Sequence, residues 1–97
     1  MQLDWNNEKN ALLKKERQIC FEDIAVALEQ GGLVEMADHP NQAKYPNQKI
    51  MFVKFDNYIY MVPCIKTVKG WFLKTIFPSR KATNFYLNEG DNSHESN

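Results

Sequence analysis

The feature that most constrains the fold is a pair of apolar segments joined by two residues that favour a tight turn. Residues 49–55 alternate as a β-strand, and residues 58–65 are predicted to form its return strand. Asp56 and Asn57 lie between them, and both tolerate the positive φ angles of a two-residue hairpin. Pro63 has no N–H to donate to a neighbouring strand, so we expect a bulge or a sheet edge there.

A first helix is predicted over residues 7–17. Asn6 precedes it and is a residue type that caps helix N-termini. Leu12 and Leu13 are expected to supply much of its apolar face, and Trp5 to anchor in the core just before it.

A second helix begins at residue 19 or 20 and ends at Gly31 and Gly32. Its buried stripe has helical spacing and consists of Phe21, Ile24, Ala25 and Leu28. Residues 33–37 are expected to form a short strand. Residues 38–48, with two prolines and several amides, are predicted to form a loop whose length suggests a use.

The last predicted strand, residues 71–77, leads straight into a helix. Alternation puts Trp71, Leu73, Thr75 and Phe77 on one face and Phe72, Lys74 and Ile76 on the other. Pro78 ends the strand, and Ser79 can cap a helix that opens with Arg80 and Lys81. Two cations in a first turn oppose the helix dipole, so they either gather around an anion or point into solvent.

The order of elements predicts one α+β domain over residues 1–87. We expect two N-terminal helices, an antiparallel meander of three to four strands and a short C-terminal helix, with the helices covering one face of the sheet. Residues 88–97 lack apolar side chains and are predicted to form a disordered polar tail.

The formal net charge is zero, but the charges are unevenly distributed. Residues 1–43 carry four Lys/Arg and eight Asp/Glu, whereas residues 44–87 carry eight Lys/Arg and a single acid, Asp56. Two interpretations stay open. The basic half presents a positive field to phosphate, or the acidic helices neutralise that field in the fold.

We expect a cytoplasmic protein that needs no metal or other cofactor. The chain has no apolar run of about 18 residues that could span a membrane, and its N-terminus has no signal-peptide pattern. Cys20 and Cys64 are expected to be free thiols, because no CxxC spacing relates them. His39 and His94 are too far apart in sequence to indicate a metal site.

The residue chemistry permits a surface that would suit a phosphate backbone. Lys54 and Lys74 lie among apolar strand residues and mark a solvated face of the sheet, which Arg80 and Lys81 could extend. Tyr60 either stacks on bases beside this face or is a half-buried sheet residue.

RNA carries its own nucleophile, the 2′-hydroxyl, so cleavage needs only positioning, charge stabilisation and proton transfer. Cations can stabilise the phosphorane, and a His, Tyr, Lys or carboxylate can move the protons. His39 is either such a proton carrier or a solvated loop residue.

Two sequence blocks resemble the BrnT toxins. The first is W-N-x-E-K followed by I-x-F-E-D-I-A, where the family typically shows W-D-x-x-K and V-x-F-x-E-A. The second is K-T-I-F-P-S-R-K-A-T, against I-x-x-A-R-x-A-T in the family. The matching residues are Trp5, Lys9, Ile19, Phe21, Glu22 or Asp23, Ile76, Arg80, Lys81, Ala82 and Thr83. Two departures stand out: Asn6 replaces the usual Asp, and Glu16, Arg17 and Gln18 replace a common Lys-His-Gly.

The resemblance implies a toxin of a type II toxin–antitoxin pair with a RelE-like fold. Such toxins cleave RNA without a metal, inhibit translation and are neutralised by a small DNA-binding antitoxin. It singles out Arg80 as the phosphate-stabilising residue. Our expected catalytic residues are therefore Arg80, Lys74 and His39, and our expected RNA-binding residues are Lys54, Lys81, Lys49 and Tyr60. A module of the same fold that binds RNA or protein without cleavage is the alternative.

Overall fold

The predicted hairpin forms the centre of the sheet. Strands β3 (Gln48–Phe55) and β4 (Tyr58–Lys66) pair antiparallel in a continuous register, from Gln48 opposite Ile65 to Phe55 opposite Tyr58. Asp56 and Asn57 adopt φ angles of 53° and 62°, which confirms the two-residue turn.

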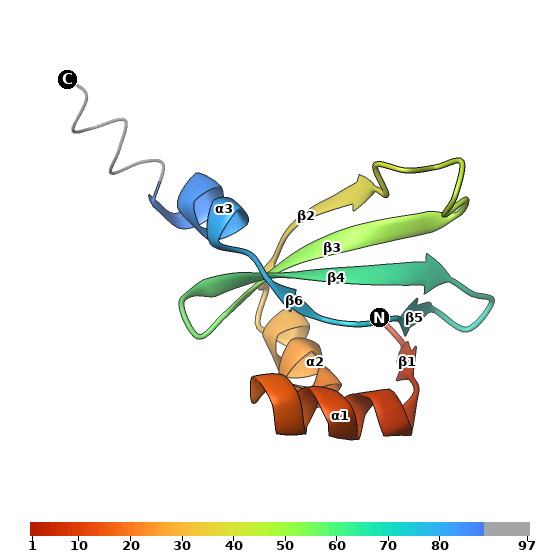
Figure 1. Cartoon of the computed structure of the whole chain (residues 1–97), viewed down its shortest axis with the longest axis horizontal. Helices are drawn as coiled ribbons and strands as arrows, with labels where there is room; N and C mark the ends of the chain where they lie inside the picture. Colours follow the sequence, from red (N-terminus) through yellow and green to blue (C-terminus); the bar gives the residue numbers. More distant parts are fainter. Residues whose placement is uncertain (89–97) are drawn as a thin grey trace.

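The computed structural model, which describes residues 1–88, is α+β with a mixed sheet of six strands (Figure 1). The strand order is β1-β5-β4-β3-β2, and β6 pairs with β4 beside β5. The additional strands are β1 (Leu3–Trp5), β2 (Leu33–Asp38), β5 (Trp71–Leu73) and β6 (Phe77–Pro78). Apart from Asn88, the predicted disordered tail lies outside the described residues.

β2, β3, β4 and β5 pair antiparallel in chain order, but the sheet as a whole is mixed rather than antiparallel as expected, because β1 runs parallel to β5. Three residues are too few to show alternation, so nothing local marks β1 as a strand. Gly70 allows the pairing: a Cβ built there would lie 2.2 Å from the Gln2 carbonyl oxygen, so any side chain would push β1 away.

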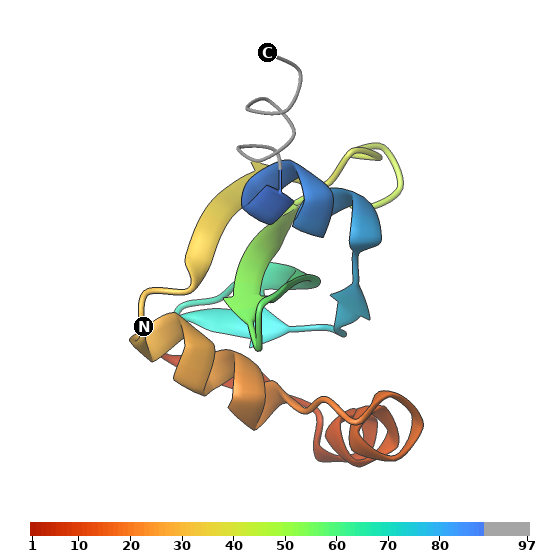
Figure 2. The same ribbon diagram turned by 90° about the vertical axis from the view of Figure 1, so that its left-hand side faces the viewer.

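The two predicted N-terminal helices are confirmed as α1 (Asn7–Arg17) and α2 (Phe21–Glu29). The Asn6 side chain accepts a hydrogen bond from the Lys9 amide at 2.9 Å and so caps α1. Figure 2 shows α1 and α2 on one face of the sheet, whereas α3 (Arg80–Thr83) lies on the other. A π-helical turn, η1 (Asn84–Asn88), follows α3. The expectation that all helices cover one face is therefore wrong.

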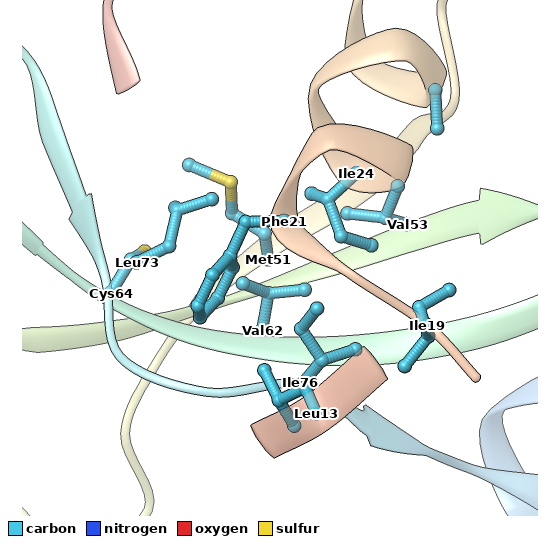
Figure 3. Packing of buried hydrophobic residues seen from close by; sticks show 11 residues of the cluster. Leu13, Ile19, Phe21, Ile24, Met51, Val53, Val62, Cys64, Leu73 and Ile76 are labelled. Atoms are coloured by element: carbon cyan, nitrogen blue, oxygen red, sulfur yellow. The ribbon is translucent and has the colours of Figure 1, made fainter. Parts of the chain in front are cut away.

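The main core lies between the sheet and the N-terminal helices (Figure 3). The ring of Trp5 stacks on that of Phe21 at 5.5 Å, as its anchoring role predicts. Leu13 is buried, but Leu12 is 44% exposed, so only one of the two leucines packs in the core. The buried cluster is Leu13, Ile19, Phe21, Ile24, Ala27, Met51, Val53, Val62, Cys64, Leu73 and Ile76.

The single strand predicted over residues 71–77 is broken in two. β5 pairs with Cys64–Lys66, and β6 pairs with Tyr60 and Met61 further along β4. Leu73 and Ile76 both lie in the main core, although an unbroken strand would place them on opposite faces. Residues 74–76 link β5 to β6 outside the regular strand pairing, so the alternation of side chains between the two faces does not continue across them.

This break also explains Pro63, which lies in a central strand without a bulge. Its carbonyl accepts a hydrogen bond from the Lys74 amide at 2.8 Å. Because the N and C=O of one strand residue face the same neighbour, the missing N–H of Pro63 faces the gap between β5 and β6. The predicted bulge or edge position is wrong because the neighbouring strand, rather than β4, is interrupted.

Candidate functional site

The turn that carries Arg80 is hydrogen-bonded to β4 at several points. The Ser79 amide donates to the Ile59 carbonyl at 3.0 Å, and the Ser79 hydroxyl accepts from the Ala82 amide at 3.0 Å. The Thr83 hydroxyl accepts from the Ile59 amide at 2.8 Å and donates to the Ser79 carbonyl at 2.7 Å. Thr83 therefore joins the two ends of the turn to one residue of the central strand.

This anchoring separates the four residues of the turn into two buried and two exposed ones. Ala82 and Thr83 are each only 7% exposed, whereas Arg80 and Lys81 are exposed to solvent. The helix is confirmed, but it spans only four residues. It is too short to support an anion site through its dipole, so any phosphate binding must come from the two side chains.

Three of the predicted site residues form what we call the Arg80 group: Lys54, Arg80 and Lys81. Lys54 lies opposite Ile59, the residue that holds the turn, and its side chain is exposed. Met51 and Val53 face the main core, so alternation places Lys54 on the face that also carries α3. Lys74 lies outside this group: its amide donates to the Pro63 carbonyl, and Pro63 pairs with Ile50, four residues or about 13 Å along β4 from Ile59.

The cations of the Arg80 group have no ion-pair partners in the described part of the chain. Within residues 1–88, the one ion pair joins Lys49 to Asp38. A cation that is not held in an ion pair remains available to an anionic ligand.

The second group, which we call the loop group, consists of His39, Lys44, Lys49 and Lys66. The His39 amide donates to the Gln48 carbonyl at 3.0 Å. Its Nδ1 accepts from the Asn41 amide at 3.0 Å, and its ring packs on Tyr45 at 4.4 Å. His39 therefore helps to hold the loop between β2 and β3.

The lysines of the loop group all have partners. Lys49 pairs with Asp38 at 2.5 Å, and the Nζ of Lys44 lies 5.3 Å from the centre of the Tyr45 ring. Lys66 lies 5.2 Å from the Trp71 ring. Lys49 and Lys66 line a groove of about 360 Å³ that also contains the Asp38 carboxylate.

The structure does not bring His39 to Arg80. His39 bonds to Gln48 and the Arg80 turn bonds to Ile59, which lies opposite Lys54. The six residue steps from Gln48 to Lys54 correspond to about 20 Å along β3. The predicted catalytic residues therefore divide between two ends of the sheet, with Lys49 at the His39 end.

Tyr60 lies on the face of the sheet that α1 and α2 cover, half-buried against the main core. Its ring contacts those of Phe55 and Tyr58, with centroids 6.3 and 5.7 Å away. Burial raises the pKa of the Tyr60 phenol, so at neutral pH this group can donate a proton but cannot act as a base. Of the two roles predicted for Tyr60, its position is that of a half-buried sheet residue.

Arg17, the last residue of α1, is a candidate functional residue outside the predicted site. Its Nη1 donates to the Ile76 carbonyl at 2.6 Å, and its guanidinium carbon lies 5.2 Å from the centre of the Phe77 ring. The replacement of Lys-His-Gly at residues 16–18 marked this position, but sequence spacing cannot show that α1 ends beside β6.

Residues 1–88 contain no group of three His, Cys, Asp or Glu side chains that could hold a metal ion. Cys20 and Cys64 are free thiols, as expected. Among the described helices, none has the length and apolar character needed to cross a membrane.

Comparisons with protein-family models, with curated proteins and with solved structures find no match to this chain. Its function must therefore be inferred from its own residues and their geometry.

Proposed function

We propose that the protein is a metal-independent endoribonuclease toxin of the BrnT kind with a RelE-like fold. It would cleave RNA, inhibit translation and be neutralised by a cognate DNA-binding antitoxin. The observation that carries this proposal is the Arg80 turn: Ala82 and Thr83 are buried against β4, while Arg80 and Lys81 face solvent without carboxylate partners in residues 1–88.

Two local features support the resemblance on which the proposal draws. Gln18 adopts a left-handed conformation with φ 55° at the end of α1, and the family pattern has glycine at this position. Asn6 caps α1 where the pattern has aspartate, which is an equally good capping residue.

In the proposed reaction, the 2′-oxygen attacks the adjacent phosphorus, and the bond from phosphorus to the 5′-oxygen breaks. Arg80 stabilises the negative charge of the pentacoordinate phosphorane, with Lys81 next to it in the chain. A base takes the 2′-hydroxyl proton, and an acid protonates the leaving 5′-oxygen. Lys74 lies about 13 Å along β4 from Ile59, so in this proposal it contacts the RNA backbone rather than the reacting phosphate.

Expression of the wild type and of Arg80→Ala without antitoxin tests this function. The wild type should stop growth and fragment cellular RNA, whereas Arg80→Ala should do neither. Lys44→Ala removes a cation from the loop group and should remain toxic, which controls for overall charge. Equal growth and intact RNA with the wild type and Arg80→Ala would contradict the toxin proposal.

One observation favours the second candidate, a module that binds RNA without cleaving it. His39 is the single histidine among residues 1–88, and it lies at the opposite end of the sheet from Arg80. No imidazole in the described residues can therefore transfer protons beside Arg80. RNA binding that weakens with salt, together with intact RNA after long incubation, would favour this candidate.

A further inference from the structure

Phe77 is an exposed aromatic residue at an open side of the sheet. It lies in β6 opposite Met61, and β6 pairs with β4 alone among the described strands. Ile76, next to it, is fully buried, whereas Phe77 is 43% exposed. The buried Ile76 side chain therefore fixes the neighbouring backbone, and the Phe77 ring is held at the surface in contact with solvent.

Arg17 approaches this ring from the end of α1. One guanidinium nitrogen is held by the Ile76 carbonyl, and the group lies over the Phe77 ring at 5.2 Å. Both partners are uncharged, and within residues 1–88 no carboxylate pairs with Arg17. Since a guanidinium has five N–H donors, donors remain for a ligand, and its full positive charge is preserved.

Lys74 and Arg80 lie three residues before and three residues after Phe77. The exposed ring is thus flanked along the chain by two cations and covered in part by a third. Aromatic rings and arginine planes stack on the unpaired bases of single-stranded nucleic acids, while nearby cations contact the phosphates. In a duplex the base faces are stacked on one another and are not accessible to such a surface.

We propose that Phe77 and Arg17 form a subsite for single-stranded RNA next to Arg80, in which Phe77 stacks on a base and Arg17 contacts the adjacent phosphate. This inference rests on the proposed function and specifies its substrate class. It assigns a binding role to two residues outside the predicted site.

The test measures binding of fluorescein-labelled oligouridine by fluorescence anisotropy over a range of KCl concentrations. A 2′-O-methyl oligonucleotide is used because it lacks the attacking hydroxyl and cannot be cleaved. Phe77→Leu should weaken binding about tenfold without changing the salt dependence, because it removes stacking but no charge. Phe77→Trp should bind at least as tightly as the wild type.

Arg17 is tested in the same assay. Arg17→Ala should weaken binding and lower the slope of log K against log salt by about 0.7, the value for one phosphate contact on a single strand. Arg17→Lys should keep the slope but not the full affinity, because a lysine cannot form the planar contact. Lys15→Ala and Phe85→Leu are the matched controls, and both should behave as the wild type.

The outcomes separate this inference from the proposed function. If the wild type binds no RNA, both fail. If Arg80→Ala weakens binding but Phe77→Leu and Arg17→Ala do not, the subsite is wrong while the proposed function stands. Equal affinity for a duplex of the same length would also overturn the subsite. Circular dichroism of each variant identifies any loss of affinity that comes from unfolding.

Discussion

Cations lie near both ends of the β3–β4 hairpin, but in different environments. At the loop end, Lys49 pairs with Asp38, and Lys44 and Lys66 lie against aromatic rings. At the other end, the Arg80 group has no carboxylate within ion-pair distance in residues 1–88. The difference shows that the basic character of residues 44–87 is not a single surface: part of it is used internally, and part stays available to a ligand.

The largest effect should follow from loosening the Arg80 turn. Thr83→Val removes the acceptor of the buried Ile59 amide and one donor to Ser79, so we expect a loss of about 2–4 kcal/mol of unfolding free energy. RNA affinity should fall along with it, because Arg80 would no longer be held. Chemical denaturation measures the first effect, and Thr83→Ser, which keeps the hydroxyl, is the control. Unchanged stability in Thr83→Val would show that the turn is held by other contacts.

The loop end of β4 can be probed by pH through Cys64, which is fully buried. Burial raises the pKa of its thiol from 9.0 to about 11. Above pH 9 the unfolded chain loses this proton first and then binds fewer protons than the folded one, so stability falls as pH rises. The loss should reach about 2 kcal/mol near pH 11.

Urea unfolding of the wild type and of Cys64→Ala between pH 8 and 11 checks this expectation. The other titrating groups contribute equally to both proteins, so their effect cancels in the difference between the two stability profiles. Parallel pH profiles for the two proteins would show that the thiol does not titrate separately in the folded state.

A smaller effect should distinguish the two groups of cations directly. Lys54→Ala and Lys81→Ala should each weaken RNA binding several-fold and lower the salt slope by about 0.7. Lys44→Ala and Lys66→Ala should leave affinity and slope unchanged, because those cations are engaged with rings. If all four variants lose affinity equally, the contrast between the two ends does not govern binding.

The smallest effect should come from freeing a cation at the loop end. Asp38→Asn breaks the exposed pair with Lys49, whose side chain is 44% exposed, so stability should change by less than about 1 kcal/mol. Released Lys49 should then raise the salt slope of RNA binding, by at most about 0.7. Ala43→Ser, at an exposed position in the same loop, serves as the control. A salt slope that does not rise would mean that the position of Lys49, rather than its partner, keeps it from RNA.

The elements with strong local signals could be predicted from the sequence. The cap at Asn6, the turn at Asp56 and Asn57 and the stop at Gly31 depend on neighbouring residues, so their chemistry is visible in a few letters. The same holds for Ser79, whose hydroxyl caps the short helix as expected.

The errors concern long-range pairing. β1 is a strand because Gly70 leaves room for Gln2 beside it, and residues 71–77 divide because β4 pairs with them in two separate registers. Pro63 could not be interpreted correctly until the gap opposite it was known. In each case the cause lies far along the chain from the effect, where periodicity carries no information.

The sequence by itself determined an α+β chain with a central hairpin, two capped helices and a basic C-terminal half. Only the tertiary structure decided which cations are free, that His39 and Arg80 lie at opposite ends of the sheet, and that Arg17 covers Phe77. The physical reason is that capping and turn formation involve residues a few positions apart. The environment of a charge, in contrast, depends on which distant strands and helices pack around it.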